Sequence, residues 1–403
     1  MRLAPRTNRR ILLPVAVVAA LAAAASGAAA LLPDSSAAKS AAAAADGLPH
    51  TAVEVSPGAC GHGWDRPSAG RQVFDLRNTS SDPAEVYLTD TSTGALLGEV
   101  EGLAPGVQRP LQVVLGRGSY AFRCLPEDAD AVTGPTVRIT AGPATGGPAV
   151  LPVTEHDLIP PTLEYQKWIG QGLGALVGKV DALRDAVDSG DLPAARTAWL
   201  TAHLGYSRLG AAYDAFGDLG DAVDGLADGQ PDGVKDQGFT GFHRIEYGLW
   251  HHQSADQLRA PAQQLAEDVR KLRDQWADAR MEPADLGLRA HEITEDTVTF
   301  ELTGHNDYGS GSSLATARAQ LDGTAEVLDR LRPLLEPRDP ELPGIDQWLA
   351  RSRSDLDALG HDGSWPAPDK LTDNQRERIN ADFGGLVERL AGVAAVCDVR
   401  RTS

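Results

Sequence analysis

The organisation of this chain is decided by one stretch, Gly241-Phe242-His243-Arg244-Ile245-Glu246-Tyr247-Gly248-Leu249-Trp250. It places an imidazole and a carboxylate three residues apart in a segment whose pattern predicts the start of a helix. Side chains at this spacing lie on one helix face, with Cβ atoms about 5–6 Å apart. The two side chains are therefore close enough to share one metal ion, and the residues around them decide whether they do. For so short a motif, the alternative is a hydrogen bond at the surface or at the rim of the core.

The residues before this stretch are aromatic and then acidic. Trp199, Tyr206 and Tyr213 fall at helical spacing, which favours a place in the core. Residues 217–238 are rich in Gly and Asp and predict a long irregular loop, a kind of segment that is usually functional. The aspartates of this loop, Asp224 among them, either steer cations toward a site or form an ordinary solvated face.

Helical periodicity begins near Asp157 and continues almost to the end of the chain. Asp191 and Thr372 stand where helix N-caps are expected. Because seven helices are too many for one four-helix bundle, residues 155–403 are predicted to form an all-α domain of two helical bundles. The predicted helices span residues 163–187, 192–216, 255–278, 283–302, 314–335, 343–359 and 372–396.

Residues 50–142 have the character of strands. Short runs rich in Val, Leu and Thr are separated by turn residues such as Ser81-Asp82-Pro83 and Ala104-Pro105-Gly106. A segment of this length and pattern predicts a small β-sandwich. The Gly- and Pro-rich residues 141–148 separate it from the helices. The clearest strand runs are residues 71–76, 85–88 and 112–115.

Residues 1–46 are predicted to be a signal peptide and a linker. Four arginines precede an apolar run from Ile11 to Ala25, and the small residues Ala28-Ala29-Ala30 follow it, which is the pattern of a secretory signal. No Cys lies near the cleavage region, so a lipoprotein anchor is excluded, whereas an uncleaved membrane anchor stays an alternative. We therefore expect an extracytoplasmic protein.

The chain is strongly acidic. It has 56 Asp and Glu residues against 37 Lys and Arg residues, a formal net charge of −19. No basic patch lies beyond the first ten residues. Such a charge repels nucleic acids and attracts metal cations, so we expect no nucleic-acid partner.

The block Gly241-Phe-His-Arg-Ile-Glu246 with its aromatic flanks resembles the imelysin-like family, and within it the EfeO type of exported iron-uptake component. The resemblance covers nearly all of the mature chain. It implies a cupredoxin-like β-sandwich followed by an all-α imelysin-like domain. It also implies a metal site at His243, Glu246 and Asp224. Imidazole with carboxylates suits Fe²⁺, Fe³⁺, Mn²⁺ or Zn²⁺.

The same resemblance implies a function and partners. The protein would bind iron without being an enzyme and deliver it to a membrane iron permease, in an EfeUOB-type system whose third component is a haem peroxidase. The chain carries no CxxCH motif, so no haem of its own is expected.

The second helix departs from the family pattern. Many EfeO-type proteins have two carboxylates where this chain has Ser207 and Gly210. A later Thr-Gly-Glu-Glu segment appears here as Thr303-Gly-His-Asn306. His305 or Asp307 is therefore a candidate replacement ligand.

The cysteines of the β-domain leave two alternatives open. Cys60 and Cys124 either form a disulfide, which we favour, or bind copper or another soft metal with a carboxylate such as Glu85. A blue-copper centre is excluded because no His or Met follows Cys124 closely enough. Cys397, on the last predicted helix, is expected to be a buried thiol.

Two other functions compete with iron binding. An imelysin-like metallopeptidase would use the same site, but it needs a general base that the motif does not supply. The sequence His291-Glu292-Ile293-Thr294-Glu295 begins like a zinc-protease helix, yet Glu295 stands where the second His is required. A structural or adhesion module, in which the His243–Glu246 pair binds nothing, is the third possibility.

Overall fold

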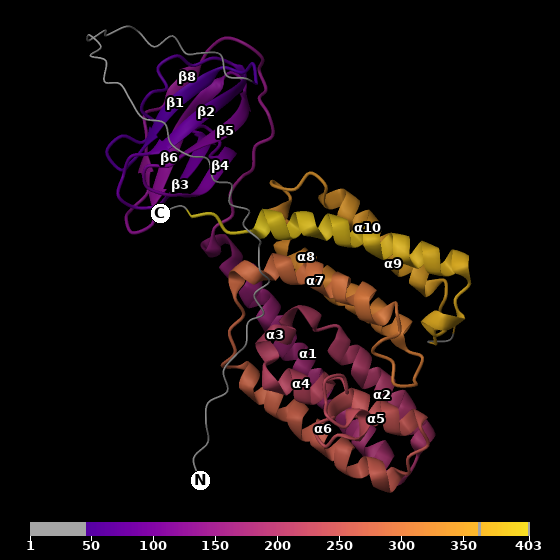
Figure 1. Cartoon of the computed structure of the whole chain (residues 1–403). Helices are drawn as coiled ribbons and strands as arrows, with labels where there is room; N and C mark the ends of the chain where they lie inside the picture. The colour runs from indigo at the N-terminus through magenta and orange to yellow at the C-terminus, as the bar shows by residue number, and fades with distance from the viewer. Residues whose placement is uncertain (1–45, 362–363, 402–403) are drawn as a thin grey trace, which may run out of the picture. The chain divides into compact units, whose positions relative to one another are not determined.

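The computed structural model describes residues 46–361 and 364–401, and the predicted signal peptide lies outside this range. Strands come first and helices follow (Figure 1). This order confirms the predicted fold class of a β-domain followed by an all-α domain. None of the helices in the described residues is long and apolar enough to cross a membrane.

Two sheets pack around one core in the β-domain. One sheet has the order β1-β2-β5, with β1 and β2 parallel; the other has the order β4-β3-β6-β7, with β8 also paired to β6. Buried and exposed residues alternate along β5, where Leu111, Val113 and Leu115 face the core. The strands are β1 (His50–Val55), β2 (Gly70–Asn78), β3 (Ala84–Asp90), β4 (Leu96–Leu103), β5 (Gln108–Leu115), β6 (Gly118–Pro126), β7 (Val132–Thr133) and β8 (Val137–Ile139).

The core of this sandwich is aromatic at its centre. Trp64, Phe74 and Phe122 meet edge to face, with ring centroids 4.8–5.7 Å apart. Cys60 and Cys124 join the same buried cluster. The cupredoxin type that the resemblance implies stays a prediction.

The helical domain consists of two bundles that share one continuous apolar core. The first contains α1, α2, α5 and α6, and the second contains α7, α8, α9 and α10. The helices are α1 (Glu155–Ser189), α2 (Leu192–Ser207), α3 (Tyr213–Phe216), α4 (Asp218–Asp224), α5 (Gly241–Trp250), α6 (Ala255–Trp276), α7 (Leu286–Asp296), α8 (Ser313–Leu335), α9 (Leu342–Asp357) and α10 (Asp373–Cys397). Short turns of helix are η1 (Gly210–Ala212), η2 (Gly233–Lys235), η3 (Pro283–Asp285), η5 (Pro368–Lys370) and the π-helical η4 (Thr297–Glu301).

Helix starts follow the caps that the sequence suggested. The side chain of Asp191 accepts a hydrogen bond from the backbone N–H of Ala194 at the start of α2. Thr372 and Gln375 form a capping box at the start of α10. Cys397 is buried and unpaired at the end of that helix, as expected.

Four predicted segments differ from the structure. The helix predicted from residue 163 begins at Glu155, where Thr154 and Asp157 form a capping box. The helix predicted over residues 192–216 ends at Ser207, whose hydroxyl bonds back to the carbonyl of His203, and η1 and α3 follow. The helix predicted over 283–302 is divided, because Pro283 begins the separate turn η3 and the chain widens into η4 after α7. The predicted loop of residues 217–238 contains α4 and η2, so only its later part is irregular.

Candidate metal centre

Helix α5 begins against the end of α4, and a glycine makes this contact possible. Gly241 has φ +77°, and a Cβ atom on it would collide with the carbonyl oxygen of Val223. The hydroxyl of Thr240 donates to the carbonyl of Ala222 at 3.0 Å and holds the same junction. Asp224, the last residue of α4, is therefore brought next to the first turn of α5 and its His243.

Helix α2 supplies a second histidine. The indole N–H of Trp199 donates to the carbonyl of Phe242 at 2.9 Å and fixes α2 against the start of α5. One turn further along α2, the His203 ring stacks on Trp199, with ring centroids 4.8 Å apart. His203 is 5% exposed and faces the same point as His243, which is 3% exposed.

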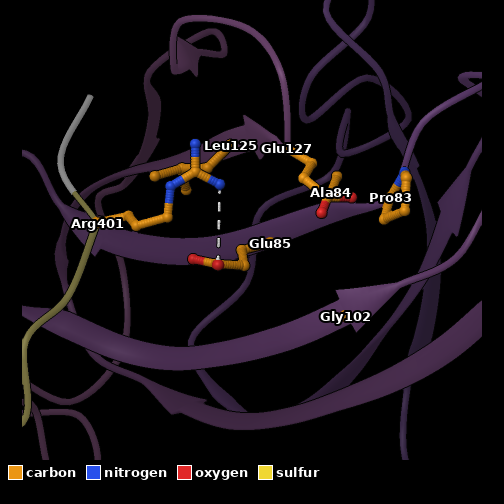
Figure 2. Close-up of a pocket in the computed structure, with 7 residues that line it drawn as sticks. All are labelled: Pro83, Ala84, Glu85, Gly102, Leu125, Glu127 and Arg401. Atoms are coloured by element: carbon orange, nitrogen blue, oxygen red, sulfur yellow. Dashed lines mark ion pairs between the residues drawn. The ribbon is translucent and has the colours of Figure 1, made fainter. Parts of the chain in front are cut away.

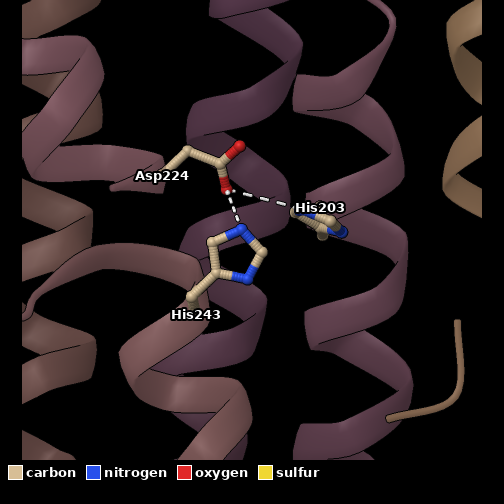
Figure 3. Close-up of side chains that lie close together, drawn as sticks. All are labelled: His203, Asp224 and His243. Carbon is tan, nitrogen blue, oxygen red and sulfur yellow. Dashed lines mark ion pairs between the residues drawn. The ribbon is translucent and has the colours of Figure 1, made fainter. Parts of the chain in front are cut away.

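Three side chains from three helices converge on one point (Figure 3). The Oδ1 atom of Asp224 lies 3.4 Å from Nε2 of His203 and 3.6 Å from Nε2 of His243. One ligand atom from each of the three lies within 4.8 Å of the other two. The Asp224 Oδ1 atom is buried and makes no hydrogen bond in the described part of the chain. An unbonded buried carboxylate oxygen between two imidazole nitrogens fits a metal cation, because it otherwise lacks a partner.

Glu246 contacts the Nδ1 atom of the His243 ring and not the Nε2 atom, which faces Asp224. Its Oε2 atom accepts a hydrogen bond from Nδ1 of His243 at 3.1 Å. Its Oε1 atom accepts from the backbone N–H groups of Tyr308 and Ser310, at 3.1 and 3.2 Å, and from the Ser310 hydroxyl at 2.5 Å. Both oxygens are therefore engaged. Glu246 thus contacts the His243 ring and is not one of the three converging side chains; the expectation that it binds the same ion as His243 stays a prediction.

The consequence is a fixed histidine tautomer. When His243 is neutral, as a metal ligand must be, Glu246 holds its proton on Nδ1 and the lone pair of Nε2 faces Asp224. A carboxylate that orients a metal-binding histidine in this way is a common companion of protein metal sites. The contact of Glu246 with Nδ1 of His243 is the geometry of a positioning residue.

Charges at the centre are strongly coupled. Burial lowers the pKa of His243, but Asp224 and the Glu246 hydrogen bond outweigh this effect and raise the pKa to about 9. Burial raises the pKa of Glu301, the last residue of η4, to about 7, while the nearby charges of His203 and His243 pull it down. Glu301 is 5% exposed and accepts a hydrogen bond from the Asn306 amide at 3.3 Å. It is a further carboxylate beside the two histidines.

The other two predicted ligands lie outside the converging group. His305 is half exposed and pairs with Asp228 on the surface, with Nε2 and Oδ2 3.0 Å apart. Asp307 accepts a hydrogen bond from the backbone N–H of Gly309 at 2.6 Å. Both belong to the loop that holds Glu246, so they support the positioning residue and do not join His203, Asp224 and His243.

Sequence reasoning missed His203 and Glu301. A signal for His203 was present, because it follows Trp199 by four residues and precedes Tyr206 by three. That spacing puts a polar ring on the buried face of α2, where polar side chains need a partner. Glu301 gave no comparable signal, because the π-helical turn shifts its face relative to the regular helix that was predicted.

In the β-domain, Cys60 and Cys124 form a disulfide, which is the alternative that the sequence favoured. Their sulfur atoms are therefore not thiolates that could bind copper or another soft metal. Glu85 accepts a hydrogen bond from the Tyr87 hydroxyl at 2.8 Å and lies 3.9 Å from Nη1 of Arg401, in a surface pocket (Figure 2). The disulfide therefore excludes the alternative of a metal site at Cys60, Cys124 and Glu85.

Comparison with known proteins identifies the family of the chain. The family model described as imelysin matches residues 162–393, more than half of the chain. The chain belongs to the imelysin family. The match contains all of the helices that carry the converging side chains, and it confirms the resemblance predicted from residues 241–246.

Several curated relatives of this imelysin-family chain carry iron-uptake names. It is 28% identical over 329 residues to the iron uptake system component EfeO of Yersinia pestis, covering 81% of this chain and 86% of the relative. It is 27% identical over 358 residues to EfeO of Escherichia coli strain K12, covering 87% and 92%. It is also 26% identical over 243 residues to the iron uptake system component EfeM of Pseudomonas syringae, covering 58% and 83%.

Proposed function

We propose that this protein is the extracytoplasmic iron-binding component of an EfeUOB-type iron-uptake system. His203, Asp224 and His243 hold the iron, Glu246 orients His243, and the cargo passes to a membrane iron permease. The single observation that carries the proposal is the unbonded, buried Oδ1 atom of Asp224 between two imidazole Nε2 atoms. The iron-uptake names of relatives that align with most of this chain support the cargo.

The donor set suits ferrous iron. Two imidazoles and one carboxylate with open positions are a recurrent ligand set for non-haem Fe²⁺. Three protein ligands leave further coordination positions open, which a carrier needs because its cargo has to leave again. Glu301 is not one of the three converging side chains, but it shares their charged surroundings, and its raised pKa of about 7 leaves it partly protonated near neutral pH.

Export and partners complete the proposal. The Cys60–Cys124 disulfide supports an oxidising compartment, because such bonds are rare in cytosolic proteins. The membrane permease would receive the iron, and the haem peroxidase would be the third component.

The proposal is tested by iron content and affinity. Wild-type protein and the His203→Ala, Asp224→Asn and His243→Ala variants would be loaded anaerobically with Fe²⁺, then measured by elemental analysis and calorimetry. His291→Ala is the matched control, because His291 lies in the other bundle with Glu295 at 3.5 Å. We expect iron to be lost from the three variants and kept by the control. Wild-type iron content in His203→Ala and His243→Ala would refute the proposal.

A metallopeptidase is the second candidate, and one observation favours it. The raised pKa of Glu301, about 7, is near the value that suits a general base. Iron carriage has the stronger support because of the relatives' names. Cleavage of an unfolded protein substrate by the metal-loaded chain, abolished by Glu301→Gln, would establish the peptidase instead.

A further inference from the structure

A cavity lies beside α5, on a different face of this helix from the candidate metal centre. It has a volume of about 570 Å³ and lies between the segment from Val234 to Thr240, helix α5 and the start of α6. Arg244 and Tyr247 line it from α5. Each residue along a helix turns the side-chain direction by about 100°. Arg244 therefore points away from the face that carries His243 and Glu246.

Arg244 is the unusual residue of this cavity. Its Nη1 atom donates to Oε1 of Gln253 at 2.9 Å, which is a neutral partner. In the described part of the chain, no carboxylate oxygen lies within 4.0 Å of its guanidinium nitrogens. Burial lowers its pKa, and no carboxylate offsets this effect. Part of the half-buried Arg244 guanidinium is therefore without a carboxylate partner and is available to an anion that enters the cavity.

The rest of the lining supports an organic anion. Lys235 adds a second cation that pairs with no carboxylate in the described residues. Asp236 also lines the cavity, but its carboxylate accepts hydrogen bonds from the backbone N–H groups of Asp232 and Gly238, at 3.2 and 2.7 Å. Phe239 and Pro261 contribute carbon surface. The volume falls within the range of small-molecule pockets and exceeds what an inorganic oxyanion fills.

We propose that this cavity binds a small organic anion with two or more carboxylates, one of them paired with Arg244 and another with Lys235. The guanidinium fork is suited to bidentate pairing with a carboxylate. The binding site is separate from the metal centre, so the inference does not rest on the proposed iron-carrier function.

Calorimetry of the metal-free mature chain with citrate tests this inference. Tricarballylate, which has the same three carboxylates without the hydroxyl, inorganic phosphate and neutral glycerol are the comparison probes. Ionic strength is held constant because screening changes charge pairing. We expect citrate and tricarballylate to bind, and glycerol not to bind. Arg244→Gln should weaken citrate binding by about tenfold or more, since charge-assisted hydrogen bonds contribute at that level.

Two further variants make the test decisive. Lys235→Gln changes an exposed side chain that does not contribute to folding contacts, and it should weaken citrate binding several-fold. Arg259→Gln is the matched control, because this arginine of α6 lies outside the cavity and pairs with Asp256 at 2.5 Å. Equal citrate affinity in wild type, Arg244→Gln and Lys235→Gln would overturn the proposal. So would no citrate binding at millimolar concentration, or phosphate binding as tight as citrate with the same dependence on Arg244.

Discussion

Glu246→Gln separates a positioning role from a ligand role. In the native centre, the Oε1 atom of Glu246 accepts three hydrogen bonds, from the backbone of Tyr308 and from the backbone and hydroxyl of Ser310. The amide oxygen of a glutamine will occupy this position, because only an acceptor satisfies those donors. The amide NH₂ then faces Nδ1 of His243.

This single reversal changes the tautomer of His243. Facing a donor, Nδ1 must be the unprotonated nitrogen, so the proton of neutral His243 moves to Nε2, the atom that faces Asp224. A protonated Nε2 cannot bind a metal ion. Loss of such an outer partner typically weakens metal binding 10–100-fold. This corresponds to about 1.4–2.7 kcal/mol.

Anaerobic titration with Fe²⁺, and with Co²⁺ as a spectroscopic substitute, measures the effect. We expect Glu246→Gln to bind 10–100-fold more weakly but with the wild-type Co²⁺ spectrum once saturated. His243→Ala, which removes a ligand, should bind more weakly still and alter that spectrum. If Glu246→Gln abolishes binding as completely as His243→Ala, Glu246 is itself a ligand and the assignment fails.

Three further predictions concern the fold. Replacing both Cys60 and Cys124 by Ala opens a link across a sequence separation of 64 residues and should destabilise the β-sandwich by about 2–5 kcal/mol; urea unfolding checks this, and an unchanged midpoint would contradict it. Gly241→Ala should lower stability by more than about 1 kcal/mol. It should also weaken iron binding, because α5 must move away from α4. The control Gly174→Ala, in open space on α1, should be neutral or stabilising. Equal thermal midpoints for the two variants would refute this argument. Asp382 is fully buried, and burial together with a neighbouring carboxyl raises its pKa from 3.8 to about 6. Between these two pH values the folded state binds a proton that the unfolded state has lost. The free energy of unfolding therefore falls as pH rises through that interval. Asp382→Asn should therefore raise the thermal midpoint at pH 7.5 but not near pH 4, and a shift of the same size at both pH values would contradict the assignment.

The sequence was sufficient for the architecture because periodicity and caps are local. Alternating residues predicted the strand of β5, and Asp191 and Thr372 marked helix starts that the structure contains. The predicted helix end on α2 was wrong because a side chain there competes for the backbone hydrogen bonds of the helix. The Ser207 hydroxyl bonds to the carbonyl of His203, and such a local effect leaves hydrophobic spacing unchanged.

The centre was predicted less completely because it depends on contacts between helices. Spacing on one helix placed His243 and Glu246 on a common face, which the structure contains. Spacing cannot tell whether the second side chain meets the ion or the first ring. That choice is made by the loop of Tyr308 and Ser310, more than sixty residues later, which engages Glu246 from behind.

The missing carboxylates of α2 now have a physical explanation. At the first of these positions, Ser207 is buried and its hydroxyl is bonded back to its own helix. At the second, a Cβ atom on Gly210 would lie 3.1 Å from the Ile293 side chain, so a side chain at this position requires Ile293 to shift. His203 lies one turn before Ser207 on the same helix, and its longer ring reaches Asp224. Under the proposed function, the donor that α2 contributes to the centre is therefore an imidazole and not a carboxylate. Because two borderline nitrogen donors suit Fe²⁺ better than hard oxygen donors do, the proposed site is expected to bind Fe²⁺ more tightly than Fe³⁺. Parallel titrations with the two oxidation states would test this preference, and tighter binding of Fe³⁺ in a His203-dependent manner would contradict it.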